Sequence, residues 1–202
     1  MKTQERIISI AKSTIDTESK AIAKLSDYVD GEFAGAVTYI FNSSGRVIVT
    51  GIGKSANIAT KIVATLNSTG TPAIFMHAAD AIHGDLGTIQ EDDTVICISK
   101  SGNTPEIKVL VPLIKAMGNK LVAITGNIES FLGKQADFVL NAHVQKEACP
   151  NNLAPTSSTT AQLVIGDALA MCLLDLHGFS SMGCLISRAD CQRFSGSFSR
   201  QV

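Results

Sequence analysis

Residues 47–55 are Val47-Ile48-Val49-Thr50-Gly51-Ile52-Gly53-Lys54-Ser55, a short apolar run that leads into a glycine-rich turn, and a helical pattern of apolar residues follows over 56–66. Further helical patterns occur at 105–117 and near 130–135. Four more apolar runs lie downstream, at 73–75, 95–98, 121–124 and 138–140. The runs are continuous, as is typical of strands covered on both faces. Strand–helix–strand repetition therefore predicts an α/β fold, with a doubly wound parallel five-stranded sheet in a three-layer αβα arrangement.

Helical patterns also flank this region on both sides. Residues 3–29 carry apolar residues at helical spacing, and a second short helix is expected at 33–41. A long helix from about 158 to 177, ended by Gly178, is expected to close the domain. The expected division is N-terminal helices that pack on the domain at 1–45, a core domain at 46–179 and an atypical C-terminal tail at 180–202.

The composition restricts the classes of function. The 202 residues are 45% hydrophobic, which is enough for one substantial core and short for two domains. The 17 basic and 18 acidic residues nearly cancel, so we expect neither nucleic acid nor a membrane surface as a partner. No stretch is expected to span a bilayer, and the polar start is unlike a secretory signal. Five scattered cysteines without a CxxC pair indicate reduced thiols in a cytoplasmic protein and no zinc site.

The turn after the first predicted strand is a candidate binding loop. In doubly wound sheets, ligands bind at the carboxyl ends of the strands, and a helix N-terminus favours an anion. The turn does not fit a Walker A loop, which needs Gly where the chain has Ile48, nor a dinucleotide fingerprint, since no acidic residue occurs at 71–73. A substrate site at Gly53, Lys54 and Ser55 and a tight turn with a solvated lysine both remain open.

The loop after the third predicted strand combines hydroxyl groups with a helix start. Thr104 is placed as the N-cap and Pro105 as the first helical residue. Capping explains these two residues but leaves Ser99, Ser101 and Gly102 unexplained. Hydroxyls and main-chain N–H groups at the positive end of a helix dipole can hold a phosphate dianion. We therefore predict phosphate binding by Ser99, Ser101, Asn103 and Thr104.

Three other elements carry candidate chemistry. Glu106 directly follows Pro105 and is either an ordinary first-turn carboxylate or a general base. His83, between Ile82 and Gly84-Asp85, is a candidate proton carrier because its unperturbed pKa lies near neutrality. Five consecutive hydroxyl residues at 156–160 exceed the need of one N-cap at Ser157 or Ser158. A second set of donors for phosphate or sugar is the alternative, and its candidates are Glu147, Thr156, Ser157 and Thr159.

Seven blocks of sequence, in this order, resemble the SIS-domain family and, within it, the arabinose-5-phosphate isomerases. The resemblance runs from about Val47 to Phe179. The blocks are Gly51-Ile52-Gly53-Lys54-Ser55, Gly70-Thr71-Pro72-Ala73, His83-Gly84-Asp85-Leu86-Gly87, Ser99-Lys100-Ser101-Gly102-Asn103-Thr104-Pro105-Glu106, Glu147-Ala148-Cys149-Pro150, Leu153-Ala154-Pro155-Thr156-Ser157-Ser158-Thr159-Thr160 and Gly166-Asp167-Ala168-Leu169-Ala170.

The resemblance implies an isomerase that interconverts D-ribulose 5-phosphate and D-arabinose 5-phosphate, the entry step to the acidic sugar Kdo of lipopolysaccharide or capsule. It also implies a flavodoxin-like sheet, a small-molecule sugar phosphate as the partner, no metal or organic cofactor, and a homotetramer. The serine–threonine loop would bind phosphate. Lys54, His83 and Glu106 match the usual catalytic candidates, for which we expect roles as electrostatic stabiliser, proton carrier and base.

Two departures from the family keep other functions open. Longer members carry paired CBS domains, for which this chain has no room. Members also continue past Gly-Phe into a His-Pro-Gly-Gly segment, whereas Gly178-Phe179 is followed here by a tail with no His and no Pro. One alternative is a non-catalytic sugar-phosphate sensor. The other is an isomerase of another ketose phosphate.

Overall fold

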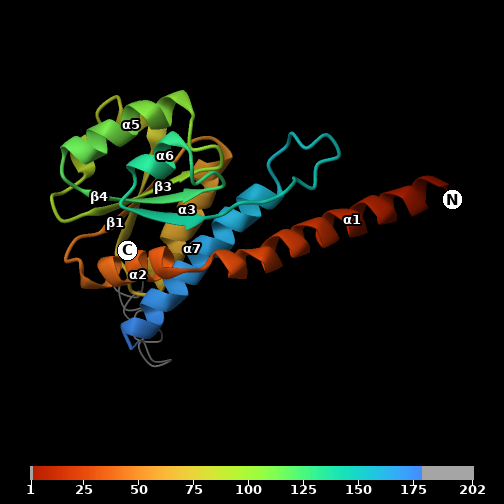
Figure 1. Cartoon of the computed structure of the whole chain (residues 1–202), viewed down its shortest axis with the longest axis horizontal. Helices are drawn as coiled ribbons and strands as arrows, with labels where there is room; N and C mark the ends of the chain where they lie inside the picture. Colours follow the sequence, from red (N-terminus) through yellow and green to blue (C-terminus); the bar gives the residue numbers. More distant parts are fainter. Residues whose placement is uncertain (1, 179–202) are drawn as a thin grey trace, which may run out of the picture.

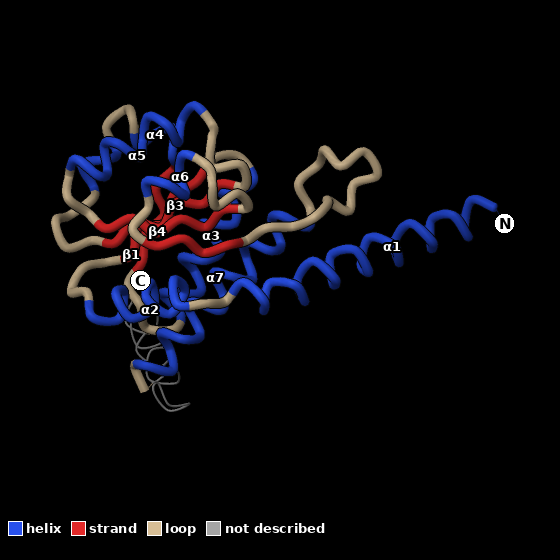
Figure 2. The backbone as a smooth tube through the Cα atoms, in the orientation of Figure 1, coloured by secondary structure: helices blue, strands red, loops and turns tan. Residues whose placement is uncertain are grey.

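Five parallel strands form the centre of the molecule, whose computed structural model describes residues 2–178 (Figure 2). The strands are β1 (Val47–Gly51), β2 (Ala73–His77), β3 (Thr94–Ser99), β4 (Lys120–Thr125) and β5 (Phe138–Asn141). Their order in the sheet is β2-β1-β3-β4-β5, and every neighbouring pair is parallel. Each predicted apolar run is a strand, and the predicted parallel α/β fold is confirmed.

Seven α-helices and two 3-10 helices occur in the described chain. The helices are α1 (Lys2–Lys24), α2 (Gly31–Asn42), α3 (Lys54–Ser68), α4 (Ala78–Ala81), α5 (Pro105–Ala116), α6 (Phe131–Gln135) and α7 (Ser157–Leu176), with η1 (Leu25–Tyr28) and η2 (Asp85–Thr88) as the 3-10 turns. The sequence missed α4 and η2 because four residues are too few to show an apolar period. Their segment, expected as a loop, therefore contains two short helical turns.

The sheet separates two apolar clusters, which makes the three layers (Figure 1). Val47 and Val49 face one cluster, with side chains from α2, α3 and α7. Ile48 faces the other, with side chains from α4, α5 and α6. Because neighbouring residues of a strand point to opposite faces, an unbroken apolar run supplies both layers at once.

The first half of α1 differs from the expected packing on the domain. Its C-terminal part lies against α7, where Thr160 Oγ1 donates to Glu18 Oε2 across 3.2 Å. The N-terminal part extends past the domain, and every side chain from 3 to 13 is exposed (Figure 1). Ile7, Ile8 and Ile15 are 62%, 46% and 70% exposed, so the apolar stripe predicted from their spacing has no cover within the described chain.

Helix α7 overturns the expectation that no stretch is long and apolar enough to span a bilayer. By length and composition, α7 qualifies, and it is the one such helix among residues 2–178. Its apolar side chains Ile165, Leu169 and Leu173 nevertheless lie in the core cluster with α3. A Cβ at Gly166 would come within 2.2 Å of Ile62 Cδ1, so the two helices are in close contact. This is the packing of a core helix.

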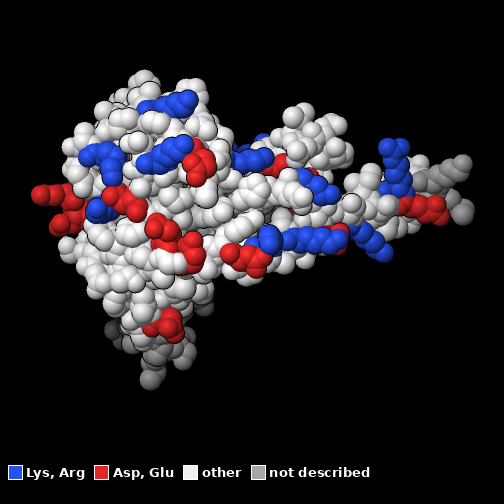
Figure 3. All heavy atoms as spheres, in the orientation of Figure 1, with Lys and Arg blue, Asp and Glu red and all other residues white. Residues whose placement is uncertain are grey.

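The expected tail at 180–202, with its missing His-Pro-Gly-Gly segment and with Cys184 and Cys191, lies outside the described residues. Over the described part, basic and acidic side chains are interspersed on the face shown in Figure 3. The whole chain has a formal net charge of −1. A charged ligand must therefore be recognised by local geometry, because no broad field of one sign would attract it.

Candidate active site

The carboxyl ends of β1 and β3 lie side by side at one edge of the sheet, and the region outside them is called the crevice below, after the usual ligand site of such sheets. These strands are neighbours, with Gly51 paired to Ile98. The chain leaves β1 for α3 on one face of the sheet and leaves β3 for α5 on the other. The strand order reverses at this point, and in open parallel sheets that is where ligands bind. The predicted candidates Lys54 and Glu106 lie in the first turns of the two helices.

The turn after β1 is shaped by its glycines. Gly53 adopts φ +58°, and a Cβ at Gly51 would come within 3.0 Å of the carbonyl carbon of Ser55. Gly53 and Lys54 are exposed. The hydroxyl of Ser55, predicted as a substrate contact, donates instead to Gln162 Oε1 across 3.2 Å. Ser55 therefore connects α3 to α7, and Lys54 is the side chain of this turn that is available to a ligand.

The loop after β3 is held by its own polar side chains. Ser99 Oγ accepts from the Gly102 N–H at 3.1 Å, and Asn103 Oδ1 accepts from the Phe131 N–H at 3.0 Å. Gly102 adopts φ +63°, and a Cβ there would meet the Ser130 hydroxyl at 2.0 Å. The loop is thus tied to the start of α6. Ser99 and Asn103 fix its shape, while Ser101 is exposed beside them.

Thr104 is the N-cap of α5, as predicted, but its side chain does not cap the helix. No side-chain cap hydrogen bond is present, and Thr104 Oγ1 is buried without a partner in the described chain. A buried hydroxyl without a partner is costly, so an acceptor supplied by a ligand would relieve it. Pro105 occupies the first helical position, and Glu106 follows half-buried in the same turn. This hydroxyl is therefore a candidate contact for a polar ligand at the start of α5.

Glu147 is buried and joins the β3 loop to α7. One carboxylate oxygen, Oε1, accepts from Lys100 Nζ at 2.6 Å and from the Ser158 hydroxyl. The other, Oε2, accepts from the Thr156 and Ser158 N–H groups at 2.8 and 3.1 Å. Burial alone would raise the pKa of Glu147, but these hydrogen bonds outweigh it and lower the pKa to about 2. Glu147 itself is thus the anion at the start of α7.

The hydroxyl cluster before α7 is largely occupied within the chain. The N-cap is Thr156, one residue before the predicted Ser157, and its Oγ1 donates to Glu147. Thr159 Oγ1 donates to the Thr156 carbonyl at 2.8 Å. Ser157 Oγ is buried without a partner in the described chain. Two of the five hydroxyls, those of Thr156 and Ser158, therefore hold the buried carboxylate, while Thr159 and Thr160 donate to the Thr156 carbonyl.

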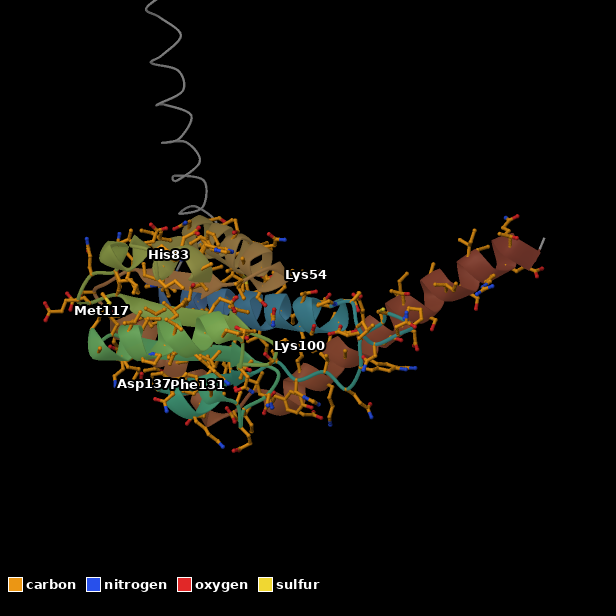
Figure 4. The ribbon with its side chains drawn as sticks, turned by 90° about the horizontal axis from the view of Figure 1, so that it is seen from above. Lys54, His83, Lys100, Met117, Phe131 and Asp137 are labelled. Atoms are coloured by element: carbon orange, nitrogen blue, oxygen red, sulfur yellow. The ribbon has the colours of Figure 1, made fainter. Side chains whose placement is uncertain are left out.

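His83 is the candidate that the chain does not bring to the crevice. It is exposed between α4 and η2. In Figure 4, Lys54 and Lys100 lie toward the same end of the molecule, and His83 lies well apart from both. Within one chain, His83 and Lys54 therefore do not face one site.

Comparison with known proteins agrees with this architecture. A family model described as the SIS domain matches residues 40–172. The chain belongs to the SIS domain family. It is 50% identical over 174 residues to the arabinose 5-phosphate isomerase KdsD of Pseudomonas aeruginosa and 48% identical over 174 residues to the arabinose 5-phosphate isomerase KpsF of Escherichia coli. Each alignment covers 86% of this chain and 53% of the relative, so the chain spans about half the length of these two relatives.

A solved structure extends the likeness of this SIS domain to three dimensions. The protein c3406 of Escherichia coli CFT073, determined in complex with arabinose 5-phosphate, is 38% identical and superposes with a TM-score of 0.87. The match covers 91% of this chain and 98% of that protein. The parallel sheet and its helical layers are therefore those of a SIS domain that has been seen with a ligand.

Two residues that support the candidate site, Lys100 and Gln162, were not predicted from the sequence. The sequence indicated no role for Lys100 beyond its place in the loop after the third strand, and none for Gln162 beyond its place in the last helix. Their importance follows from Glu147 and Ser55, which they contact from 47 and 107 residues away in the chain. A buried carboxylate needs a cationic or N–H partner, but residue spacing does not show which one.

Two cysteines show how different surroundings change the pKa of a thiol. The N–H groups of Ala154, Leu153 and Asn151 lower the pKa of the half-buried Cys149 thiol. By contrast, burial raises the pKa of Cys97 to about 12. Among residues 2–178, no group of three His, Cys, Asp or Glu side chains is arranged to hold a metal ion.

The Glu147 cluster predicts an acid-dependent stability. Its folded pKa of about 2 is below the ordinary 4.5, so its stabilisation is complete above about pH 4.5 and is lost as the pH falls toward 2. We expect Glu147→Gln to be less stable than the parent at about pH 6, and the gap to narrow by about 2 kcal/mol by about pH 3. Urea unfolding of both proteins across this range measures the gap. Asp93 and Asp137 occur in both and cancel, so a constant gap would contradict the assignment.

Proposed function

We propose that the chain is an aldose–ketose isomerase that interconverts D-ribulose 5-phosphate and D-arabinose 5-phosphate. The relatives named arabinose 5-phosphate isomerase and the structural neighbour in complex with arabinose 5-phosphate support this substrate. The observation that carries the proposal is the crevice between β1 and β3. There the partnerless hydroxyl of Thr104 lies at the start of α5, which also carries Glu106, and Lys54 starts the neighbouring helix.

The phosphate group is proposed to bind at the N-terminus of α5. The helix dipole and the free N–H groups of a first turn attract a dianion without needing a cluster of lysines. Ser101 and Thr104 would donate hydroxyl hydrogen bonds, while Ser99 and Asn103 keep the loop in shape. Ser157 is proposed as a further contact, because its hydroxyl is buried without a partner in the described chain. Gly53 would allow close approach of the sugar.

The chemistry requires one proton to move between C1 and C2 and another between O1 and O2. We assign Glu106 as the base that removes the carbon-bound proton from either sugar and returns it to the neighbouring carbon. Lys54 would stabilise the negative charge that develops on the enediolate oxygen. Glu147, Thr156 and Thr159 would act by holding the Lys100 loop in place.

His83 is proposed to carry the proton between the two sugar oxygens. Because it lies apart from Lys54 in one chain (Figure 4), this role requires that His83 serve the site of a neighbouring copy. We accordingly propose a homotetramer in the cytoplasm. The exposed isoleucines of α1 support assembly, since an interface with another copy would cover side chains that the described chain leaves exposed. The product would enter Kdo synthesis for lipopolysaccharide or capsule.

An assay of the full 202-residue chain on a panel of pentose and hexose phosphates tests the proposal. We expect turnover of ribulose 5-phosphate and arabinose 5-phosphate in preference to the hexose phosphates. Faster turnover of another ketose phosphate would change the substrate but keep the reaction class. Calorimetric binding of arabinose 5-phosphate without any turnover would instead identify a sugar-phosphate sensor.

A further inference from the structure

Gln162 is a buried polar residue that the proposed mechanism does not use. It lies in α7, one turn after Ser158, and is 1% exposed. Its Oε1 accepts a hydrogen bond from Ser55 Oγ at 3.2 Å, the one side-chain hydrogen bond that Gln162 makes within residues 2–178. Burying an amide is unfavourable unless it is hydrogen-bonded, and an apolar residue would fill the same place at a lower cost. The amide therefore calls for an explanation.

Ser55 shows what this hydrogen bond controls. It is the second residue of α3, directly after Lys54. The helix has no side-chain cap at its start, because its N-cap is Gly53 with φ +58°. A turn with glycine at positions 51 and 53 is intrinsically free to move. Thr60 Oγ1 donates to the Ala56 carbonyl within the helix, whereas the bond from Ser55 to Gln162 ties the first turn of α3 to another helix.

Helix α7 supports both sides of the crevice from successive turns. Ser158 holds Glu147, which in turn holds Lys100 in the loop after β3. Gln162, one turn later, holds Ser55 and with it the loop after β1. The two loops have no other shared polar support on α7 within the described residues. The pairing of β1 with β3 sets the separation of the two loops, and α7 adds a polar support to each of them.

We propose that Gln162 is a positioning residue for Lys54. Through Ser55 it fixes the first turn of α3, so that the ammonium group of Lys54 stays aimed at the substrate oxygen bound between the two loops. A displacement of about 1 Å at a catalytic group can reduce turnover substantially. The kinetic part of this inference rests on the proposed isomerase function, while its structural part concerns the unliganded chain alone.

The kinetic test compares variants on both sides of the hydrogen bond. We expect Gln162→Leu and Ser55→Ala each to lower kcat about 10-fold and to change KM less than about twofold, because the phosphate contacts lie elsewhere. The double variant should be no worse than either single variant, since both remove the same interaction. Ser55→Thr keeps the hydroxyl, so its kcat should stay near that of the parent. Fully additive losses, or no recovery with Ser55→Thr, would overturn the inference.

Asp167→Asn is the matched control. Asp167 accepts from Lys61 at 2.6 Å and so connects the same two helices farther from the crevice. We expect this variant to lower the thermal midpoint and leave kcat unchanged. An equal loss of kcat in Asp167→Asn and Gln162→Leu would show that general loosening of α3 against α7 explains the effect, and the positioning role would be wrong.

Hydrogen exchange separates this inference from the proposed function. In the unliganded proteins, we expect the amides of Ala56, Asn57 and Ile58, which follow the unbonded N–H groups at the start of α3, to exchange faster in Gln162→Leu than in the parent or in Asp167→Asn. Unchanged exchange at these residues contradicts the positioning role whether or not the protein is an isomerase. If Gln162→Leu exchanges faster at these residues and the parent protein shows no turnover, the positioning role is supported and only the enzymatic function is rejected.

Discussion

Glu106→Gln is expected to lower kcat for arabinose 5-phosphate by about 10²–10⁴-fold, the usual contribution of a single general base. The amide keeps the size of the side chain but cannot accept the carbon-bound proton. KM should change little, because the proposed phosphate contacts come from Ser101, Thr104 and the main chain. Steady-state kinetics in both directions, with circular dichroism to verify folding, provide the measurement.

Glu32→Gln is the matched control for this variant. Glu32 is also a first-turn carboxylate, at the start of α2, but it is exposed, and α2 packs against β5 and α7 instead of following β1 or β3. Glu32 interacts with the dipole of its helix as Glu106 does. The control therefore measures the effect of losing a first-turn carboxylate on a helix outside the candidate site. Near-normal turnover by Glu106→Gln would remove Glu106 from the role of base.

Lys54→Met should have the second-largest effect, a fall in kcat of about 10²–10³-fold, as when one donor to a developing oxyanion is removed. Met keeps the length and apolar stem of the side chain but lacks the charge. Lys54 is exposed and forms no salt bridge with a described residue, so the thermal midpoint should stay near that of the parent.

Lys108→Met controls for the general loss of a positive charge near the crevice. Lys108 is exposed on α5, two residues beyond Glu106. If attraction of the dianion by overall charge explained the effect of Lys54, both variants would raise KM at low salt and leave kcat similar. A fall in kcat confined to Lys54→Met is the expected result, and equal behaviour of the two variants would contradict the assigned role.

The sheet was predictable because its strands are buried on both faces. Val47-Ile48-Val49 must supply two apolar layers, and a continuous run is the only pattern that does so. The turn after β1 and the start of α5 were also predictable. Local backbone geometry restricts these positions to a few residue types, here glycine in the turn and Thr104-Pro105 at the helix start. The location of the site at the carboxyl edge followed from these elements.

Side-chain partners were not predictable because they join distant parts of the chain. The hydroxyls of 156–160 could have faced a ligand or a protein carboxylate, and the structure places Glu147 among them. Ser55 likewise could have faced the sugar and instead faces Gln162. The apolar spacing of α1 correctly predicted a helix, but it did not reveal that Ile7 and Ile8 would be left uncovered.

The strand order also has a consequence for how the chain is made. As a ribosome releases the chain, β1 can pair with β2 once residue 77 has emerged, but its other edge stays open until β3 is complete at residue 99. During that interval, Val47 to Val49 present an unpaired apolar edge, which is a template for aggregation. Synthesis of the segment between β2 and β3 is therefore one period in which the growing chain exposes an edge that can aggregate.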